Sequence, residues 1–185
     1  IYIGGNYNLI ENCVTHDCGD TGIQLGRSSS GLDTIDEWPS YNIIKNCTSF
    51  DNHDPLGEDS DGFACKLTTG VGNVFDGCIA YNNVDDGWDL YTKGDSGPIG
   101  PVTLINCIAF NNGVTSGRYT NGKPYGTPNS DGNGFKLDVK GAGGTWDSGI
   151  CRSGGLIKDL WVTGGFRGIF VKGADHIEKV VLENV

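Results

Sequence analysis

Four aspartates, Asp61, Asp85, Asp86 and Asp89, belong to two copies of a short turn that combines aspartate, glycine and an aromatic residue. The copies are residues 60–63 (SDGF) and 85–89 (DDGWD). A third copy, residues 132–137 (GNGFKL), has Lys136 at the position that Asp89 holds in the second copy. Clustered carboxylates can hold a hard metal ion, and a lysine can act as a base where its pKa is lowered. Whether they do so depends on how the chain positions them.

The composition indicates a chain made almost entirely of strands and turns. Its 185 residues include 31 Gly and no Met. No long stretch combines helical apolar periodicity with good helix formers, which argues against helices. A chain of this length forms one domain, which we assign to residues 1–185. Because both ends have the pattern of strands, we expect a fragment of a longer solenoid, truncated at one or both ends. A compact, capped domain is the alternative.

The sequence contains an internal repeat that is marked by cysteines. Equivalent cysteines are 34, 31 and 29 residues apart, at Cys13, Cys47, Cys78 and Cys107. Short strands that recur in this way predict an all-β fold, a right-handed parallel β-helix in which every repeat forms one coil. A propeller is the alternative, although its blades usually need about forty residues and their own signature. We expect the four stacked cysteines to be free, buried thiols, whereas the pairing of the other three stays open.

The register of such a helix predicts where the acids lie. Equivalent residues of consecutive coils are about 4.8 Å apart. Because apolar Trp88 points inward, Asp89 points outward, and the same alternation places Lys136 outward on the next coil. Asp61 and Asp86 both precede the shared glycine and therefore stack. Four carboxylates so close together repel one another unless a cation neutralises them, and all-oxygen ligands suit Ca²⁺ best. The alternative is that these Asp-Gly pairs serve only as turns.

These motifs resemble polysaccharide lyase family 9, a family of pectate lyases. The resemblance runs through residues 61–67 (DGFACKL), 72–78 (GNVFDGC), 85–91 (DDGWDLY) and 132–137 (GNGFKL). It implies a parallel β-helix, a Ca²⁺ held by Asp61, Asp85, Asp86 and Asp89, and Lys136 as the catalytic base. Some members of the family resemble rhamnogalacturonan lyases, so the identity of the pectic polymer stays open. A long insertion between Asn112 and Asp131 departs from the family pattern, and we expect it to shape the substrate groove.

The reaction that this resemblance implies is β-elimination in a uronate polymer such as polygalacturonate. A base removes the proton at C5, and the glycosidic oxygen leaves from C4. A cation on the neighbouring carboxylate stabilises the negative charge that develops, and it helps to lower the pKa of a nearby lysine. An alkaline optimum is therefore expected. Lys66, which also points outward, is the alternative base.

Several other residues are weaker candidates for substrate contacts. Arginines and lysines in the second half of the chain can grip carboxylates, and aromatic residues there can stack on sugar rings. The cations are Arg118, Lys123, Arg152 and Arg167, and the aromatic residues are Tyr119, Tyr125 and Trp146. An ordinary surface or packing role is the favoured interpretation of each, so none of them is assigned to the site.

The net charge of the chain limits the kinds of partner that it can bind. A net charge of -10 argues against nucleic acid, which needs a basic surface. No apolar run has membrane length, and no secretion signal lies within the chain. The resemblance to the pectate lyases implies a secreted or cell-surface protein whose partner is an acidic plant cell-wall polysaccharide, and we expect it to be a monomer. The alternatives are a glycoside hydrolase with paired carboxylates and a non-catalytic glycan-binding or structural β-helix with structural Ca²⁺.

Overall fold

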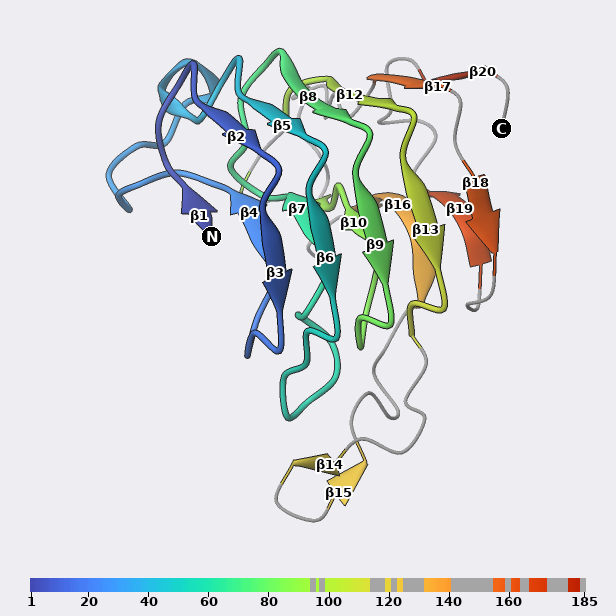
Figure 1. Cartoon of the computed structure of the whole chain (residues 1–185). Helices are drawn as coiled ribbons and strands as arrows, with labels where there is room; N and C mark the ends of the chain where they lie inside the picture. The colour runs from blue at the N-terminus through green and yellow to red at the C-terminus, as the bar shows by residue number, and fades with distance from the viewer. Residues whose placement is uncertain are drawn as a thin grey trace.

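The three-dimensional arrangement is that of a parallel β-helix (Figure 1). The structure is a computed structural model, and it describes residues 1–93, 96, 99–113, 119–120, 123–124, 132–140, 155–158, 161–163, 167–172 and 180–183. Three parallel sheets run along the solenoid, and successive coils contribute successive strands to each sheet. The fold class predicted from the cysteine-marked repeat is therefore confirmed.

The strands divide among the sheets as follows. The first sheet contains β1 (Tyr2–Ile3), β4 (Ile23–Leu25), β7 (Phe63–Cys65), β10 (Trp88–Asp89), β11 (Thr92–Lys93), β16 (Asn133–Lys140) and β19 (Arg167–Lys172). The second contains β2 (Leu9–Glu11), β5 (Ile43–Lys45), β8 (Asn73–Asp76), β12 (Val102–Ile105), β17 (Gly155–Lys158) and β20 (Val180–Glu183). The third contains β3 (Val14–His16), β6 (Thr48–Phe50), β9 (Ile79–Tyr81), β13 (Ile108–Phe110) and β18 (Trp161–Thr163).

In the part of the chain that the structure describes, three short elements lie outside these sheets. Strands β14 (Tyr119–Thr120) and β15 (Lys123–Pro124) pair with each other in antiparallel fashion. A 3-10 helix, η1 (Ile35–Glu37), lies in the long connection between β4 and β5. Among the described residues, no helix has both the length and the apolar character that crossing a membrane would require.

The register of the first sheet brings the three predicted turn copies together. Trp88 of β10 pairs with Phe63 of β7 on one side and with Phe135 of β16 on the other. As a result Asp89 pairs with Lys136, as the alternation of the sequence predicts. All three aromatic residues are fully buried, and the rings stack with centroids 4.7 Å apart for each neighbouring pair. This buried stack fixes the register of the coils that carry the acids.

The glycine directly before each of these aromatic residues lets consecutive coils approach closely. A Cβ atom on Gly87 would lie 2.5 Å from the carbonyl oxygen of Gly134, and one on Gly62 would lie 2.8 Å from that of Gly87. Contacts this short are sterically forbidden. The close approach of the coils therefore requires glycine at positions 62 and 87. These glycines directly follow Asp61 and Asp86 in the two acidic copies of the turn.

The cysteines behave as predicted from the repeat. Cys47, Cys78 and Cys107 are completely buried and Cys13 is half-buried, and all four are free. Cys18 and Cys65 are free as well, while Cys151 lies outside the described residues. Burial raises the pKa of Cys47 to about 11, which keeps this thiol protonated and unreactive at neutral pH.

Candidate metal and catalytic site

Three of the four predicted aspartates meet at the start of two neighbouring strands of the first sheet. Asp61 precedes β7, and Asp85 and Asp86 precede β10. One carboxylate oxygen of each lies within 4.8 Å of the other two. All three residues are buried, and so is Asp89, which ends β10. We refer to Asp61, Asp85, Asp86 and Asp89 as the acid cluster.

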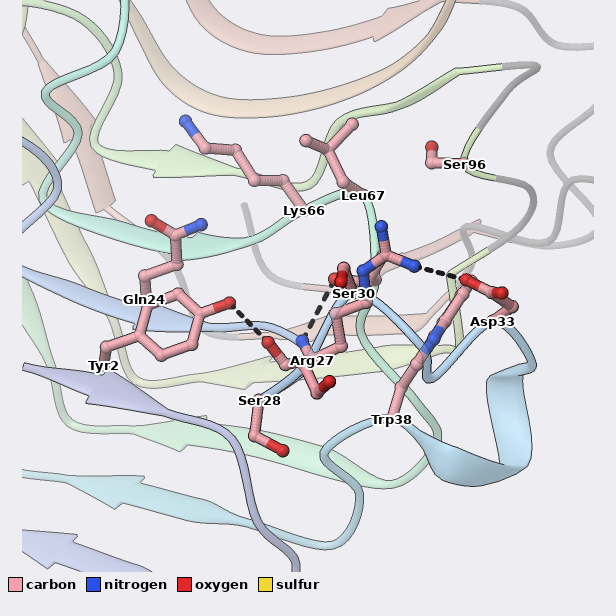
Figure 2. Close-up of a pocket in the computed structure, with 12 residues that line it drawn as sticks. Tyr2, Gln24, Arg27, Ser28, Ser30, Asp33, Trp38, Lys66, Leu67 and Ser96 are labelled. Atoms are coloured by element: carbon pink, nitrogen blue, oxygen red, sulfur yellow. Dashed lines mark hydrogen bonds and ion pairs between the residues drawn. The ribbon is translucent and has the colours of Figure 1, made fainter.

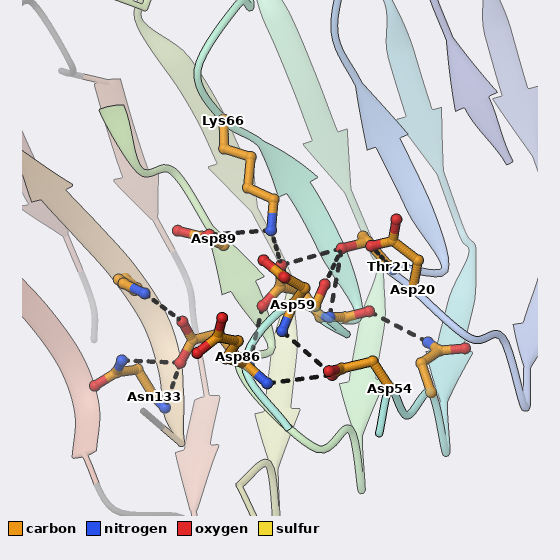
Figure 3. Close-up of polar contacts among 12 residues, drawn as sticks. Asp20, Thr21, Asp54, Asp59, Lys66, Asp86, Asp89 and Asn133 are labelled. Atoms are coloured by element: carbon orange, nitrogen blue, oxygen red, sulfur yellow. Dashed lines mark hydrogen bonds and ion pairs between the residues drawn. The ribbon is translucent and has the colours of Figure 1, made fainter. Parts of the chain in front are cut away.

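Hydrogen bonds from neighbouring coils orient two of these carboxylates (Figure 3). The backbone N–H of Asp86 donates to Oδ1 of Asp61 over 3.1 Å, and the hydroxyl of Thr21 donates to Oδ2 of Asp61 over 3.1 Å. Oδ1 of Asp86 accepts two hydrogen bonds from Asn133, one from its backbone N–H at 2.7 Å and one from Nδ2 at 2.8 Å. The positions of Asp61 and Asp86 are thus fixed by contacts that run between the coils.

Two almost completely buried lysines contact the acid cluster. Nζ of Lys66 lies 2.8 Å from Oδ2 of Asp61 and 3.4 Å from Oδ2 of Asp89, so this lysine bridges two coils (Figure 3). Nζ of Lys136 lies 3.2 Å from Oδ2 of Asp86 and 5.6 Å from the centre of the Tyr91 ring. Each lysine side chain is at most one-tenth exposed. Asp89 therefore lies outside the compact group of three acids and is joined to Asp61 through Lys66.

Burial sets the protonation of this cluster. Burial raises the pKa of Asp61 to about 6, although the positive charge of Lys66 lowers it. Burial also raises the pKa of Asp86 well above its usual value, against the lowering effect of Lys136. For Lys66, burial lowers the pKa, but the negative charges of Asp61 and Asp89 outweigh it and hold the pKa above its usual value. Lys66 is therefore positively charged at neutral pH.

Two buried carboxylate oxygens suggest that the acid cluster is built for a further cation. Among the described residues, Oδ1 of Asp89 and Oδ2 of Asp86 have no hydrogen-bond partner. Lys136 is close enough to Oδ2 of Asp86 for an ion pair, but not in hydrogen-bond geometry. Buried oxygens without partners are costly unless an ion or water satisfies them. Carboxylate oxygens are the ligands that Ca²⁺ prefers, so the residues present fit this ion.

Several site residues are absent from the sequence prediction. Thr21 and Asn133 hold the acids in place, and Lys66, which the sequence predicts only as an alternative base, is a partner of Asp61 and Asp89. A signal for the first two exists in the sequence. Thr21, Asp61, Asp86 and Asn133 occupy the same position before the shared glycine in successive copies, so they form one column along the solenoid.

The weaker candidates in the second half of the chain fall outside the side chains that the structure describes. They are Arg118, Lys123, Arg152 and Arg167, with Tyr119, Tyr125 and Trp146. Most of the insertion between Asn112 and Asp131 lies outside the described residues as well. These expectations therefore stay predictions.

The fold and the site together define the class of protein. The molecule is a parallel β-helix that carries buried carboxylates and lysines on one sheet. The chain belongs to the family described as Pel9A-like, right handed beta helix region, whose model matches residues 1–152. The resemblance inferred from the Asp-Gly motifs is thereby confirmed.

Similar proteins are named as pectate lyases. The chain is 59% identical over 138 residues to pectate lyase L of Paenibacillus polymyxa (strain SC2), a match that covers 74% of this chain and 29% of the relative. It is 54% identical over 140 residues to pectate lyase L of Thermoclostridium stercorarium, which covers 75% of this chain and 11% of the relative. The chain thus spans less than a third of these curated relatives.

Two solved structures have similar folds. The crystal structure of pectate lyase Pel9A matches with a TM-score of 0.66 and 29% identity, over 89% of this chain and 34% of that chain. A rhamnogalacturonan lyase matches with a TM-score of 0.67 and 27% identity, over 99% of this chain and 40% of that chain.

Proposed function

We propose that the chain carries the catalytic site of a Ca²⁺-dependent polysaccharide lyase that cleaves a uronate-containing pectic polymer by β-elimination. The observation that carries this proposal is the pairing of Lys136 with the acid cluster. Lys136 is the register partner of Asp89 on the first sheet, and its amine lies 3.2 Å from the carboxylate of Asp86. A potential base and a potential cation site are thus adjacent, and β-elimination needs both.

In this proposal the acid cluster holds the calcium ion. Asp61, Asp85 and Asp86 already converge, and Asp89 supplies a further oxygen without a hydrogen-bond partner among the described residues. When bound, the ion supplies positive charge beside the uronate carboxylate, which favours the negative charge that develops as the proton leaves. The hydrogen bonds from Thr21 and Asn133 orient two of the ligands, Asp61 and Asp86.

Lys136 is assigned the role of base. Its Nζ takes the proton from C5 of the uronate, and the electron pair of that C–H bond forms the double bond between C4 and C5. The C4–O bond breaks, and the glycosidic oxygen leaves with its electrons and takes a proton from water. Lys66 is less suitable because it bridges two carboxylates, Asp61 and Asp89, which keep it protonated.

The proposed substrate is polygalacturonate, and the proposed location is outside the cell, where this polymer occurs in plant walls. The names of the curated relatives support this choice, because they are called pectate lyases. Rhamnogalacturonan is the second candidate, because a solved rhamnogalacturonan lyase has a similar fold over 99% of the chain.

Ultraviolet absorbance of the products tests the proposal. The protein is incubated with polygalacturonate and, separately, with rhamnogalacturonan, each in the presence of Ca²⁺ and of a chelator. A lyase generates an unsaturated sugar that absorbs in the near ultraviolet, and the proposal predicts a Ca²⁺-dependent rise on polygalacturonate. New reducing ends without absorbance would identify a hydrolase. No product from folded, Ca²⁺-loaded protein on either polymer would contradict the proposal and favour a binding module.

A further inference from the structure

A cavity of about 590 Å³ lies beside the acid cluster, over strands β1, β4 and β7 of the first sheet (Figure 2). Its lining includes Tyr2, Gln24, Arg27, Ser28, Lys66 and Thr68. We propose that this cavity is a subsite for a uronate unit of the polysaccharide that lies away from the cleaved bond, with Arg27 as the group that binds its carboxylate. The inference rests on the proposed function, since it assumes a uronate polymer as the ligand.

The cavity lies in line with the acid cluster. One row of residues on the first sheet runs through Tyr2, Gln24, Ala64, Asp89 and Lys136, in register from coil to coil. Neighbouring strands are about 4.8 Å apart, so Gln24 lies roughly 10 Å from Asp89 along this row. Lys66 belongs to both the cavity and the acid cluster, because it lines the cavity while its amine contacts Asp61 and Asp89. A polymer that follows the sheet from the acid cluster therefore reaches the cavity within a few sugar units.

Contacts on three sides hold Arg27 in place. Its backbone N–H donates to the hydroxyl of Thr68 over 3.0 Å, and its carbonyl accepts from the hydroxyl of Tyr2 over 3.0 Å. Its Nη1 donates to the carbonyl of Leu32 over 3.2 Å. The same atom donates to Oδ1 of Asp33 over 2.6 Å (Figure 2). A side chain that is already ordered loses less entropy on binding a ligand.

The guanidinium of Arg27 keeps donors for a ligand. A guanidinium has five N–H groups, and the contacts to Leu32 and Asp33 both use Nη1. No other described residue accepts a hydrogen bond from Nε or Nη2, and one-third of the side chain is exposed. The planar fork of an arginine matches the two oxygens of a carboxylate. Arg27 can therefore keep its pair with Asp33 while it binds an anionic group.

The loop that carries Arg27 is itself well supported. Trp38 is buried, and its indole N–H donates to the carbonyl of Leu32 over 2.9 Å. The carboxylate of Glu37 accepts hydrogen bonds from the backbone N–H groups of Asp33 and Thr34. These contacts close the loop on itself and fix the wall of the cavity. They support a preformed binding site over an irregular surface depression.

The charges of the lining favour an anionic sugar over a neutral one. The chain as a whole carries a net charge of -10, which repels a polyanion. The cavity nevertheless contains Arg27, whose guanidinium keeps donors for a carboxylate, whereas the amine of Lys66 is already paired with Asp61 and Asp89. Among the described residues that line it, Asp33 is the only acid, and it is strongly exposed and paired with Arg27. Gln24, Ser28 and Thr68 add polar groups that suit sugar hydroxyls.

Binding of oligogalacturonates tests the inference. Calorimetry with Ca²⁺ measures the Kd of trigalacturonate and hexagalacturonate on a Lys136→Ala background, which prevents cleavage. We expect Arg27→Ala to raise the Kd of the hexamer about tenfold, since a hydrogen bond to a charged group contributes roughly that factor. The trimer is too short to occupy the acid cluster and the cavity at once, so the substitution raises its Kd less. Lys45→Ala removes the same charge from a half-buried position on the second sheet and leaves both Kd values unchanged.

Two further variants keep the test decisive if Arg27→Ala does not fold. Arg27→Lys keeps the charge but not the fork, and Gln24→Leu alters the cavity from strand β4. Both are expected to weaken binding of the hexamer more than binding of the trimer. Values equal to those of Lys45→Ala for every folded variant would overturn the subsite. A failure of the subsite proposal can be told apart from a failure of the lyase proposal. The product absorbance of the unmutated protein tests the lyase proposal independently of these affinities.

Discussion

Asp89 and Lys136 are register partners on adjacent strands of the first sheet, yet each pairs with a different residue. Asp89 contacts Lys66 at 3.4 Å, whereas Lys136 contacts Asp86 at 3.2 Å. The two lysines contact the acid cluster from the coils on either side of β10, and Asp86 and Asp89 each keep an oxygen without a hydrogen bond among the described residues. This arrangement is a partly neutralised cation site in which Lys66 contacts Asp61 and Asp89, and Lys136 contacts Asp86.

Removal of one carboxylate is expected to weaken calcium binding. Asp86→Asn keeps the size of the side chain and an acceptor oxygen for Asn133, but it removes a negative charge from the centre of the cluster. We expect the Kd for Ca²⁺ to rise about tenfold or more, since affinity follows the number of charged ligands. Calorimetric titration measures it. Asp76→Asn, on the second sheet, is the matched control. Equal affinities for the two variants would show that Asp86 is not a ligand.

Calcium affinity is expected to fall as the pH falls through about 6. Burial raises the pKa of Asp61 to about 6, above its usual value, so folding favours the neutral form of this carboxyl in the absence of metal. That contribution to the stability of the metal-free protein is fully present at acidic pH and is lost as the pH rises through 6. Calcium needs the charged form and therefore competes with the proton. Titrations at pH 5 and pH 8 should give a weaker Kd at pH 5, and identical values would contradict this reading.

Lys66→Met is expected to destabilise the metal-free protein more than the calcium-loaded protein. The substitution removes the cation that bridges Asp61 and Asp89 and leaves two buried carboxylates without it. Breaking a buried ion pair typically costs roughly 3 kcal/mol, and a bound calcium ion compensates part of this loss. Urea unfolding with chelator and with excess Ca²⁺ gives the two free energies of unfolding. The same loss in both conditions would mean that Lys66 and the metal do not share these ligands.

The register of the first sheet could be predicted from the sequence, because it depends on features that recur in every coil. Alternation around Trp88 and Phe135 predicts that Asp89 and Lys136 are neighbours, and the structure pairs them. The shared glycine likewise predicts that Asp61 and Asp86 stack, and the hydrogen bond between them follows from that column.

The contacts of long side chains and irregular loops could not be predicted in the same way. Alternation indicates that Lys66 points outward, but a flexible side chain of this length can reach several neighbours, and register does not select Asp61 and Asp89. Arg27 lies in the connection between β4 and β5, residues 26–42, which is much longer than the equivalent connection of the next coil, residues 66–72, so the repeat does not predict its position. Its position depends on local hydrogen bonds to Thr68 and Leu32, which only the folded loop reveals.

The most direct test of the central claim is the initial rate of product absorbance on polygalacturonate for Lys136→Ala beside the unmutated protein, both with saturating Ca²⁺. Circular dichroism and the Kd for Ca²⁺ verify that the variant folds and binds the ion. Loss of a general base typically lowers the rate by about 10²- to 10⁴-fold, and we predict a loss of this size with calcium binding retained. A folded, calcium-loaded Lys136→Ala variant that still generates unsaturated product at the original rate would contradict the assignment of Lys136 as the base.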